Sequence, residues 1–126
     1  MALTAAGLNF LAQAVVGQGT PFNNANARIG VGNGTTEVSS LQTDLTGSST
    51  IRKAMDAGFP TVSNASIRFR ATFEPSEANF AWNEWGIFND ATGGVMLSRV
   101  VESNGTKQSN QTWVLDIAIT LHNTDF

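Results

Sequence analysis

The sequence predicts a mainly β fold: an antiparallel, sandwich-like domain with one N-terminal helix. Apolar and polar residues alternate over 67–73 and again over 113–121, the pattern of half-buried antiparallel strands. An aromatic segment at 79–88, a Gly93-Gly94 break and an apolar run at 95–101 together predict a hairpin. At 126 residues, we expect a single domain spanning 1–126 with a core of its own.

The N-terminal residues predict a helix. Thr4 can cap its start, and Gly17 stands where a glycine commonly ends a helix. Leu8, Leu11 and Val15 recur at helical spacing between them. We expect this apolar face to pack on the sheet, against the inward residues of the alternating strands: Ile67, Phe69, Phe73, Trp113, Leu115 and Ile117.

Two long polar loops flank a short strand. Residues 28–32 predict the strand, and 51–57 could form another. The loop at 18–27 carries Pro and Asn-Asn breakers. The stretch 35–50 is rich in Ser and Thr, and the spacing of Leu41 and Leu45 within it permits one helical turn. Because both loops are long and neutral, we expect them to be contact surfaces.

The aromatic segment changes phase within a few residues. Phe80 and Trp82 share one face of an extended chain, whereas Trp85 and Ile87 lie on the other. A β-bulge near residues 84–86, at Gly86, would re-aim the side chains. The alternative is a strand that is buried on both faces.

The composition narrows the classes of function. The net charge is −3 with only 7 Lys and Arg, which argues against nucleic acid as a partner. No apolar run approaches the length of a membrane span, and the N-terminus lacks the basic region of a secretory signal. Charged residues make up only 13% of the chain, and such a surface suits permanent protein neighbours. Without cysteine and with one histidine, His122, we expect no metal and no cofactor.

Glu84 is the ionisable residue of greatest interest because it lies between Trp82 and Trp85. A desolvated carboxylate needs a cation or several N–H donors. We expect a buried Glu–Arg pair, with Arg28, Arg52 or Arg99 as the partner. The alternative is a general acid in a small hydrolase, although no second carboxylate lies nearby in sequence.

Two further patterns have a functional and a structural interpretation. The run Gly30-Val31-Gly32-Asn33-Gly34 is superficially like a phosphate loop, but neither a helix start nor a lysine follows it. We expect a strand end and a tight turn with positive φ. Trp82 and Trp85 could stack on a sugar as a carbohydrate-binding module, but at strand spacing we expect them in the core. Hence the residues expected to matter are structural ones: Arg28, Trp82, Glu84, Trp85, Gly86, Arg99 and Trp113.

Read in order, several motifs resemble one family. Leu3-Thr4-x-x-Gly7, then Leu11-Ala12-x-Ala14 and Gly17, is similar to the opening of the N-terminal domain of phage tail-collar and tail-fibre proteins. Arg28 to Gly34, the Leu41-to-Leu45 segment and the Glu84-to-Asn89 segment, the last followed by Gly94-Val95-Met96, resemble later motifs of that family, as do Lys107 and the final strand, 113–121. Thr46-Gly47 departs from it, since Asn-Glu is usual there, and the downstream arginine comes later, at Arg52.

The resemblance implies a virion structural protein, assembled in the cytoplasm of a host bacterium. It implies a trimer whose partners are other virion proteins. Because the sequence ends at Phe126 without a fibre shaft, we expect a small accessory subunit of the tail, collar or baseplate. The alternatives are a capsid decoration protein and a carbohydrate-binding module.

Overall fold

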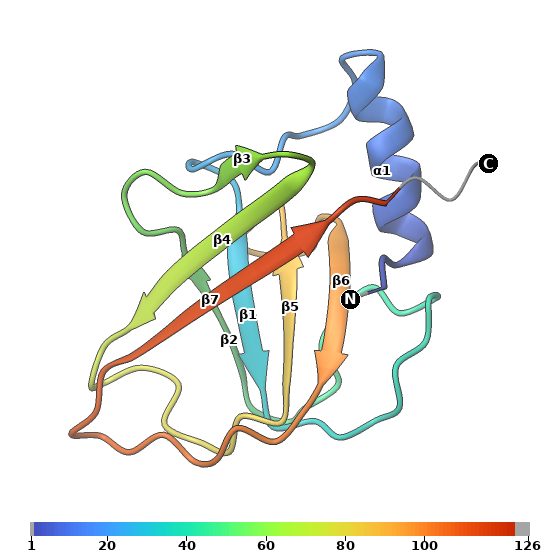
Figure 1. The fold of residues 1–126 in the computed structure, drawn as a ribbon. Helices are drawn as coiled ribbons and strands as arrows, with labels where there is room; N and C mark the ends of the chain where they lie inside the picture. Colours follow the sequence, from blue (N-terminus) through green and yellow to red (C-terminus); the bar gives the residue numbers. More distant parts are fainter. Residues whose placement is uncertain (1, 123–126) are drawn as a thin grey trace.

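Two antiparallel sheets and one helix form the domain (Figure 1), as expected from the sequence. The computed structural model describes residues 2–122. One sheet has the strand order β2-β1-β5-β6 and the other β3-β4-β7. The elements are α1 (Ala5–Val15), β1 (Arg28–Gly32), β2 (Thr50–Ala54), β3 (Thr61–Ser63), β4 (Ser66–Phe73), β5 (Glu84–Phe88), β6 (Met96–Val101) and β7 (Trp113–Thr120).

The alternating strands β4 and β7 pair along their whole length, from Ser66 opposite Thr120 to Phe73 opposite Trp113. Their inward side chains are buried or half-buried, and the outward ones include Arg68 and Asp116, as the alternation predicted. Burial of the inward faces excludes water from apolar surface, which is the main force that holds the two layers together.

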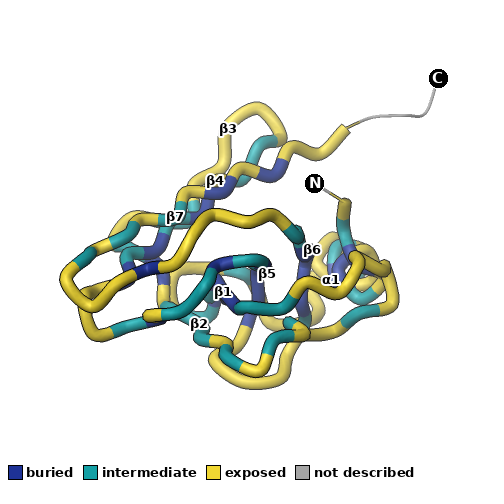
Figure 2. Tube along the Cα trace, turned by 90° about the horizontal axis from the view of Figure 1, so that it is seen from below, coloured by how far each residue is buried: buried dark blue, intermediate teal, exposed yellow. Residues whose placement is uncertain are grey.

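The three-stranded sheet crosses over the four-stranded one, as the two views show (Figures 1 and 2). β4 lies over β1 and β2, and the core fills the space between the layers. The core consists of residues from both layers and their connections: Ala27, Ile29, Val31, Met55, Phe69, Ala71, Phe73, Ala78, Trp82, Ile87, Leu97, Ile117 and Ile119.

The helix has the predicted bounds but not the predicted packing. Thr4 Oγ1 accepts a hydrogen bond from Gly7 N at 2.9 Å, and Gly17 follows the helix with φ +76°. α1 lies beside β6, and only Gly7 and Phe10 of the helix are buried. The expectation that its apolar face covers the alternating strands was therefore wrong: Leu8 is 57% exposed and Val15 87%.

The cause is the attachment of the helix start to the edge of β6. Thr4 N donates to Leu97 O at 3.0 Å, and Thr4 Oγ1 donates to Met96 O at 2.5 Å. Gly7 packs on the Leu97 backbone, where an added Cβ would lie 2.5 Å from the carbonyl oxygen. These contacts turn the Gly7 side of the helix inward and leave the leucine and valine side outward.

The helical turn expected at Leu41–Leu45 is absent from the structure. Leu41 is 80% exposed, and Leu45 instead packs beside Gly30 on β1 and Gly86 on β5. The loop follows an irregular path because its backbone amides at Thr46 and Gly47 donate to a side chain of the sheet. The strand expected at 51–57 is the shorter β2.

β5 is buried on both faces, as the second sequence interpretation proposed. The bulge predicted near 84–86 was wrong in position, because the register of β5 against β6 shifts between Ile87 and Phe88. Residues 80–83 lie outside the strand and contact 102–107 through irregular hydrogen bonds. The change of face in the sequence thus reflects a loop that enters a strand covered on both sides.

Candidate functional site

The structure places one fully buried ion pair at the start of β5. Arg99 Nε on β6 donates to Glu84 Oε1 at 2.8 Å, and both side chains are fully buried. Of the three arginines considered from sequence, Arg99 is the partner. Arg28 donates to the carbonyls of Ala25 and Ala27 instead.

Three backbone amides complete the surroundings of the carboxylate. Gly34 N and Gly47 N donate to Glu84 Oε2 at 2.9 and 2.8 Å, and Thr46 N donates to Oε1 at 2.9 Å. The Thr46 hydroxyl adds a fifth donor, after Arg99 and the three amides, at 3.2 Å. We call the Glu84 carboxylate with its donors from Gly34, Thr46, Gly47 and Arg99 the Glu84 nest. It fastens the loop 33–49 to the sheet.

The nest controls the protonation of Glu84. Burial alone would raise the pKa of Glu84, but the hydrogen bonds from Thr46 N, the Arg99 side chain and the amides of Gly47 and Gly34 outweigh it. The pKa therefore lies below its ordinary value, and the carboxylate stays ionised at neutral pH. A carboxylate of this kind, with its lone pairs already engaged, is poorly suited to donate a proton as a general acid.

The glycines around the nest are required by close approach. A Cβ on Gly32 would lie 2.5 Å from Glu84 Oε2, and a Cβ on Gly34 or Gly47 would overlap other atoms of the nest and its loop. The glycine run at 30–34 thus does approach an anion, but the anion is the protein's own carboxylate. The expected positive φ was wrong, because none of these glycines has one.

Arg99 binds two more groups of the loop. Its Nη1 donates to Gln42 Oε1 at 2.9 Å and its Nη2 to Thr46 Oγ1 at 3.0 Å. Sequence reasoning did not identify Gln42, Thr46 or Gly47 as site residues. Thr46-Gly47 departs from the Asn-Glu that is usual in the resembled family, but this departure did not indicate donors to Glu84.

Arg52 holds a second position on the same face of the sheet. Its guanidinium lies 3.6 Å from the centre of the Phe88 ring and donates to the carbonyls of Asp90 and Gly93. It also pairs with Asp44 at 3.2 Å. Arg52 therefore joins the loop 33–49 to the turn between β5 and β6.

The tryptophans lie in and against the core. Trp82 is 2% exposed, and its Nε1 donates to Ala78 O at 2.9 Å. Its ring packs edge-to-face on Phe73 at 4.8 Å and on Trp113 at 4.9 Å between ring centres. Trp85, on β5, is half-buried against the same core. Trp82 therefore offers no open ring face of the kind that sugar stacking needs.

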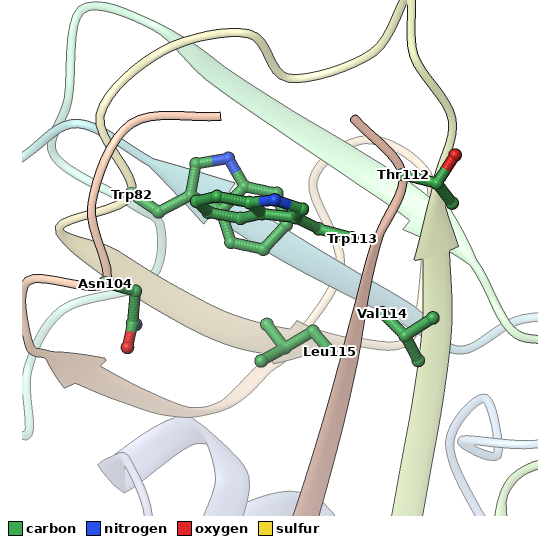
Figure 3. Close-up of a pocket in the computed structure, with 6 residues that line it drawn as sticks. All are labelled: Trp82, Asn104, Thr112, Trp113, Val114 and Leu115. Atoms are coloured by element: carbon green, nitrogen blue, oxygen red, sulfur yellow. The ribbon is translucent and has the colours of Figure 1, made fainter. Parts of the chain in front are cut away.

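A hollow of about 370 Å³ opens beside these rings (Figure 3). It is lined by Trp82, Asn104, Thr112, Trp113, Val114 and Leu115. The lining contains no carboxylate, so the hollow is separate from the Glu84 nest and joins no tryptophan to an acid.

Within residues 2–122, no three His, Cys, Asp or Glu side chains lie close enough to hold a metal ion. His122 is exposed at the end of that range. No described helix is long and apolar enough to cross a membrane.

Comparison of the chain with protein-family models, curated proteins and solved structures found no match. The resemblance to phage tail-collar and tail-fibre proteins therefore rests on the sequence motifs alone. Two features of the structure bear on function: the saturated Glu84 nest and the exposed apolar face of α1.

Proposed function

We propose that this chain is a non-enzymatic structural protein of a tailed bacteriophage particle. It acts as an assembly module of the tail-fibre, collar or baseplate type, through protein–protein contact with further copies of itself and with other virion proteins. The observation that carries the proposal is the uncovered apolar face of α1. The motif resemblance supplies the phage context.

The exposed face of α1 forms a continuous stripe, which we call the α1 stripe: Leu8, Leu11, Ala12 and Val15. Leu8 is 57% and Val15 87% exposed, and Leu11 is half-buried. Three large apolar side chains at helical spacing on one solvent-facing side are a typical contact surface, since their burial releases ordered water. The stripe replaces the loops 18–27 and 35–50 as the main contact surface that we propose.

The chemistry of α1 favours a second and third copy of the same chain as its partner. The helix contains no charged residue, and the polar side chains within it are the neutral amides Asn9 and Gln13. Identical charged helices would oppose like charges when packed together, whereas an uncharged helix meets its copies without this repulsion. Closed symmetry then satisfies every stripe at once, which agrees with the trimer implied by the resemblance.

The Glu84 nest supports a structural role over hydrolysis. All of its donors come from the protein, and they hold the carboxylate charged and fully buried. A structural ion pair needs this arrangement, whereas a general acid needs a proton and an approach for substrate. The nest instead gives the loop 33–49 a fixed shape.

The test is the oligomeric state of the purified protein, measured by sedimentation equilibrium. We expect a trimer that Leu8→Glu or Val15→Glu converts to monomer while the far-UV circular dichroism stays unchanged. Val62→Glu is the matched control, because Val62 is 73% exposed on β3, away from α1. A wild-type monomer at all concentrations, or an equal effect of Val62→Glu, would contradict the role of the stripe.

The place of the chain in the particle needs a separate measurement. Gold-labelled antibodies against the chain, imaged on intact phage particles, should mark the tail or baseplate. Label on the head would favour the alternative of a capsid decoration protein. Absence of label from disrupted particles that still contain all their proteins would overturn the virion proposal.

A further inference from the structure

β7 has one unpaired edge. Leu121 N donates to Ala65 O at 2.9 Å, and this pair continues the β4–β7 register. Hydrogen-bonding residues alternate in an antiparallel ladder, so the odd-numbered residues of β7 bond to β4. The N–H and C=O groups that point to the free edge belong to Val114, Asp116, Ala118 and Thr120, and within residues 2–122 they make no backbone hydrogen bond.

This edge lacks the usual protection against pairing. Folded proteins block long edge strands with proline, lysine, a bulge or a covering segment. β7 is eight residues long, pairs with β4 without a register shift and contains neither proline nor lysine. Its single charge, Asp116, is already engaged by Arg68 at 3.3 Å and by Arg70 at 2.7 Å.

The layer beneath the free edge also lacks a cover. We call the four-stranded sheet (β2-β1-β5-β6) the lower sheet and the three-stranded sheet (β3-β4-β7) the upper one. In the upper sheet, β4 lies over the half of the lower sheet that β1 and β2 form. On the β5–β6 half, Trp85 and Val100 form a cross-strand pair that stays half-buried. Leu115 of β7 is half-buried too, and it lines the hollow of Figure 3. One more strand beside β7 would cover these side chains.

We propose that an extended segment of another protein binds along the free edge of β7 as an added antiparallel strand. Its main chain forms hydrogen bonds with the four residues of β7 whose N–H and C=O groups point to the free edge, which we call the outward-pointing residues: Val114, Asp116, Ala118 and Thr120. Its inward side chains are apolar, and one of them enters the hollow between Trp113 and Asn104. This surface is distinct from the α1 stripe, so the proposal goes beyond the assembly through α1.

The charged residues on the outward face of β4 and β7, the face turned away from the core, indicate the charge of the added strand, which we call the guest strand. Arg68 and Arg70 both contact the carboxylate of Asp116, and Asp56 lies at the far end of this face, where it accepts a hydrogen bond from Thr72. Arg68 stands opposite Ala118 in the register, and its side chain is 56% exposed. Because Ala118 is small, Arg68 can reach across it to an acidic side chain on the added strand. The guest is therefore apolar inward and acidic outward.

A second copy of β7 does not fit this edge. Antiparallel pairing of two identical strands requires a two-fold axis perpendicular to the sheet beside β7. The lower sheet extends beyond the free edge to β6 and α1 (Figure 1), so the same elements of both copies would occupy one space. A single extended segment avoids this overlap.

The first experiment is amide hydrogen exchange on the protein alone, followed by NMR. We expect the amides of the four outward-pointing residues to exchange at least about a hundredfold faster than those of Leu115, Ile117 and Ile119. Equal protection of both sets would mean that the edge is already covered, and would overturn the proposal.

The second experiment uses a capped peptide of about seven residues that alternates valine with threonine and carries one central outward glutamate. We expect it to bind, to slow exchange of the outward amides and to change tryptophan fluorescence. A peptide with lysine in place of the glutamate should bind at least about tenfold more weakly. No binding at about 1 mM, or no preference for glutamate, would overturn the proposal.

Ala118→Pro removes the N–H of residue 118 that points to the free edge, whereas Ala118→Ser keeps this N–H and a small side chain and serves as the matched control. Proline is tolerated on an edge where its missing N–H faces solvent, so the β4–β7 ladder is expected to remain. Peptide affinity should fall at least about tenfold with proline only. If the proline variant unfolds, the wild-type protein is titrated instead with a peptide that is N-methylated at the residue pairing with Ala118. Undiminished binding, by the proline variant or of the N-methylated peptide, would count against the added strand. Repeating the titration on Leu8→Glu separates this result from the oligomeric state.

Discussion

The two faces of β5 are both buried, but different kinds of interaction stabilise them. One face carries Glu84, Gly86 and Phe88 and lies under the loop 33–49. The other carries Trp85 and Ile87 and packs in the core between the sheets. On the loop face the contacts are directional hydrogen bonds to a charge, whereas on the core face they are apolar contacts of Trp85 and Ile87 with the core.

This difference determines how each face tolerates change. A buried charge whose partner is removed retains its full cost of desolvation. Truncating an apolar side chain in a core lowers stability in proportion to the volume that is vacated. The loop face should therefore fail sharply on the loss of single groups, and the core face gradually.

The largest expected effect is that of Arg99→Met. The substitution keeps an apolar stem but leaves Glu84 buried without its cation. We expect the free energy of unfolding to fall by about 3–5 kcal/mol, as measured by urea denaturation. Arg68→Met is the control, since Arg68 lies at the surface and should cost less than about 1 kcal/mol. A similar loss of unfolding free energy in the two variants would contradict the view that the loop face depends on a buried charge.

In the core that this second face enters, Trp82→Phe should cost about 2–3 kcal/mol. The smaller ring leaves a cavity, and Ala78 O loses the hydrogen bond from the indole. Trp113→Phe should cost less, about 1 kcal/mol, because Trp113 is only half-buried and donates no side-chain hydrogen bond to the described residues. Thermal unfolding followed by circular dichroism measures the loss of stability in each variant. A larger loss for Trp113→Phe than for Trp82→Phe would contradict the assignment of Trp82 as the main core residue of the two.

The sequence was sufficient to predict those elements that depend on residues close together in the chain. Alternation along 67–73 and 113–121 identified β4 and β7, and the Thr4 and Gly17 signals identified the bounds of α1. The position of the helix was not predictable, because it depends on Thr4 bonding to β6, more than ninety residues away in the chain. Periodicity identifies an apolar face but not what covers it.

The candidate site was predictable only in part for the same reason. A carboxylate between tryptophans indicated a buried pair, and the partner was among the three arginines named. The amides of Gly34, Thr46 and Gly47 could not be found, because any residue except proline supplies an N–H and only the path of the loop selects them.

The smallest expected effect is a change in the pH dependence of stability, which tests whether the loop face is held by charge. The pKa of Glu84 lies below its ordinary value of 4.5, so the unfolded chain takes up this proton at a higher pH than the folded one. The stabilisation is complete above that value and is lost as the pH falls toward the folded-state pKa.

Glu84→Gln removes this contribution, so the difference in unfolding free energy between the wild type and the variant should be constant near neutral pH and shrink below pH 4.5. Glu77, whose pKa is lowered mainly by a hydrogen bond from Lys53, remains in both proteins and gives both an acid-side decline. The measurement is urea unfolding followed by tryptophan fluorescence from neutral pH to about pH 3. Parallel curves would mean that the nest acts through shape and hydrogen bonding alone, with no contribution from the ionised carboxylate.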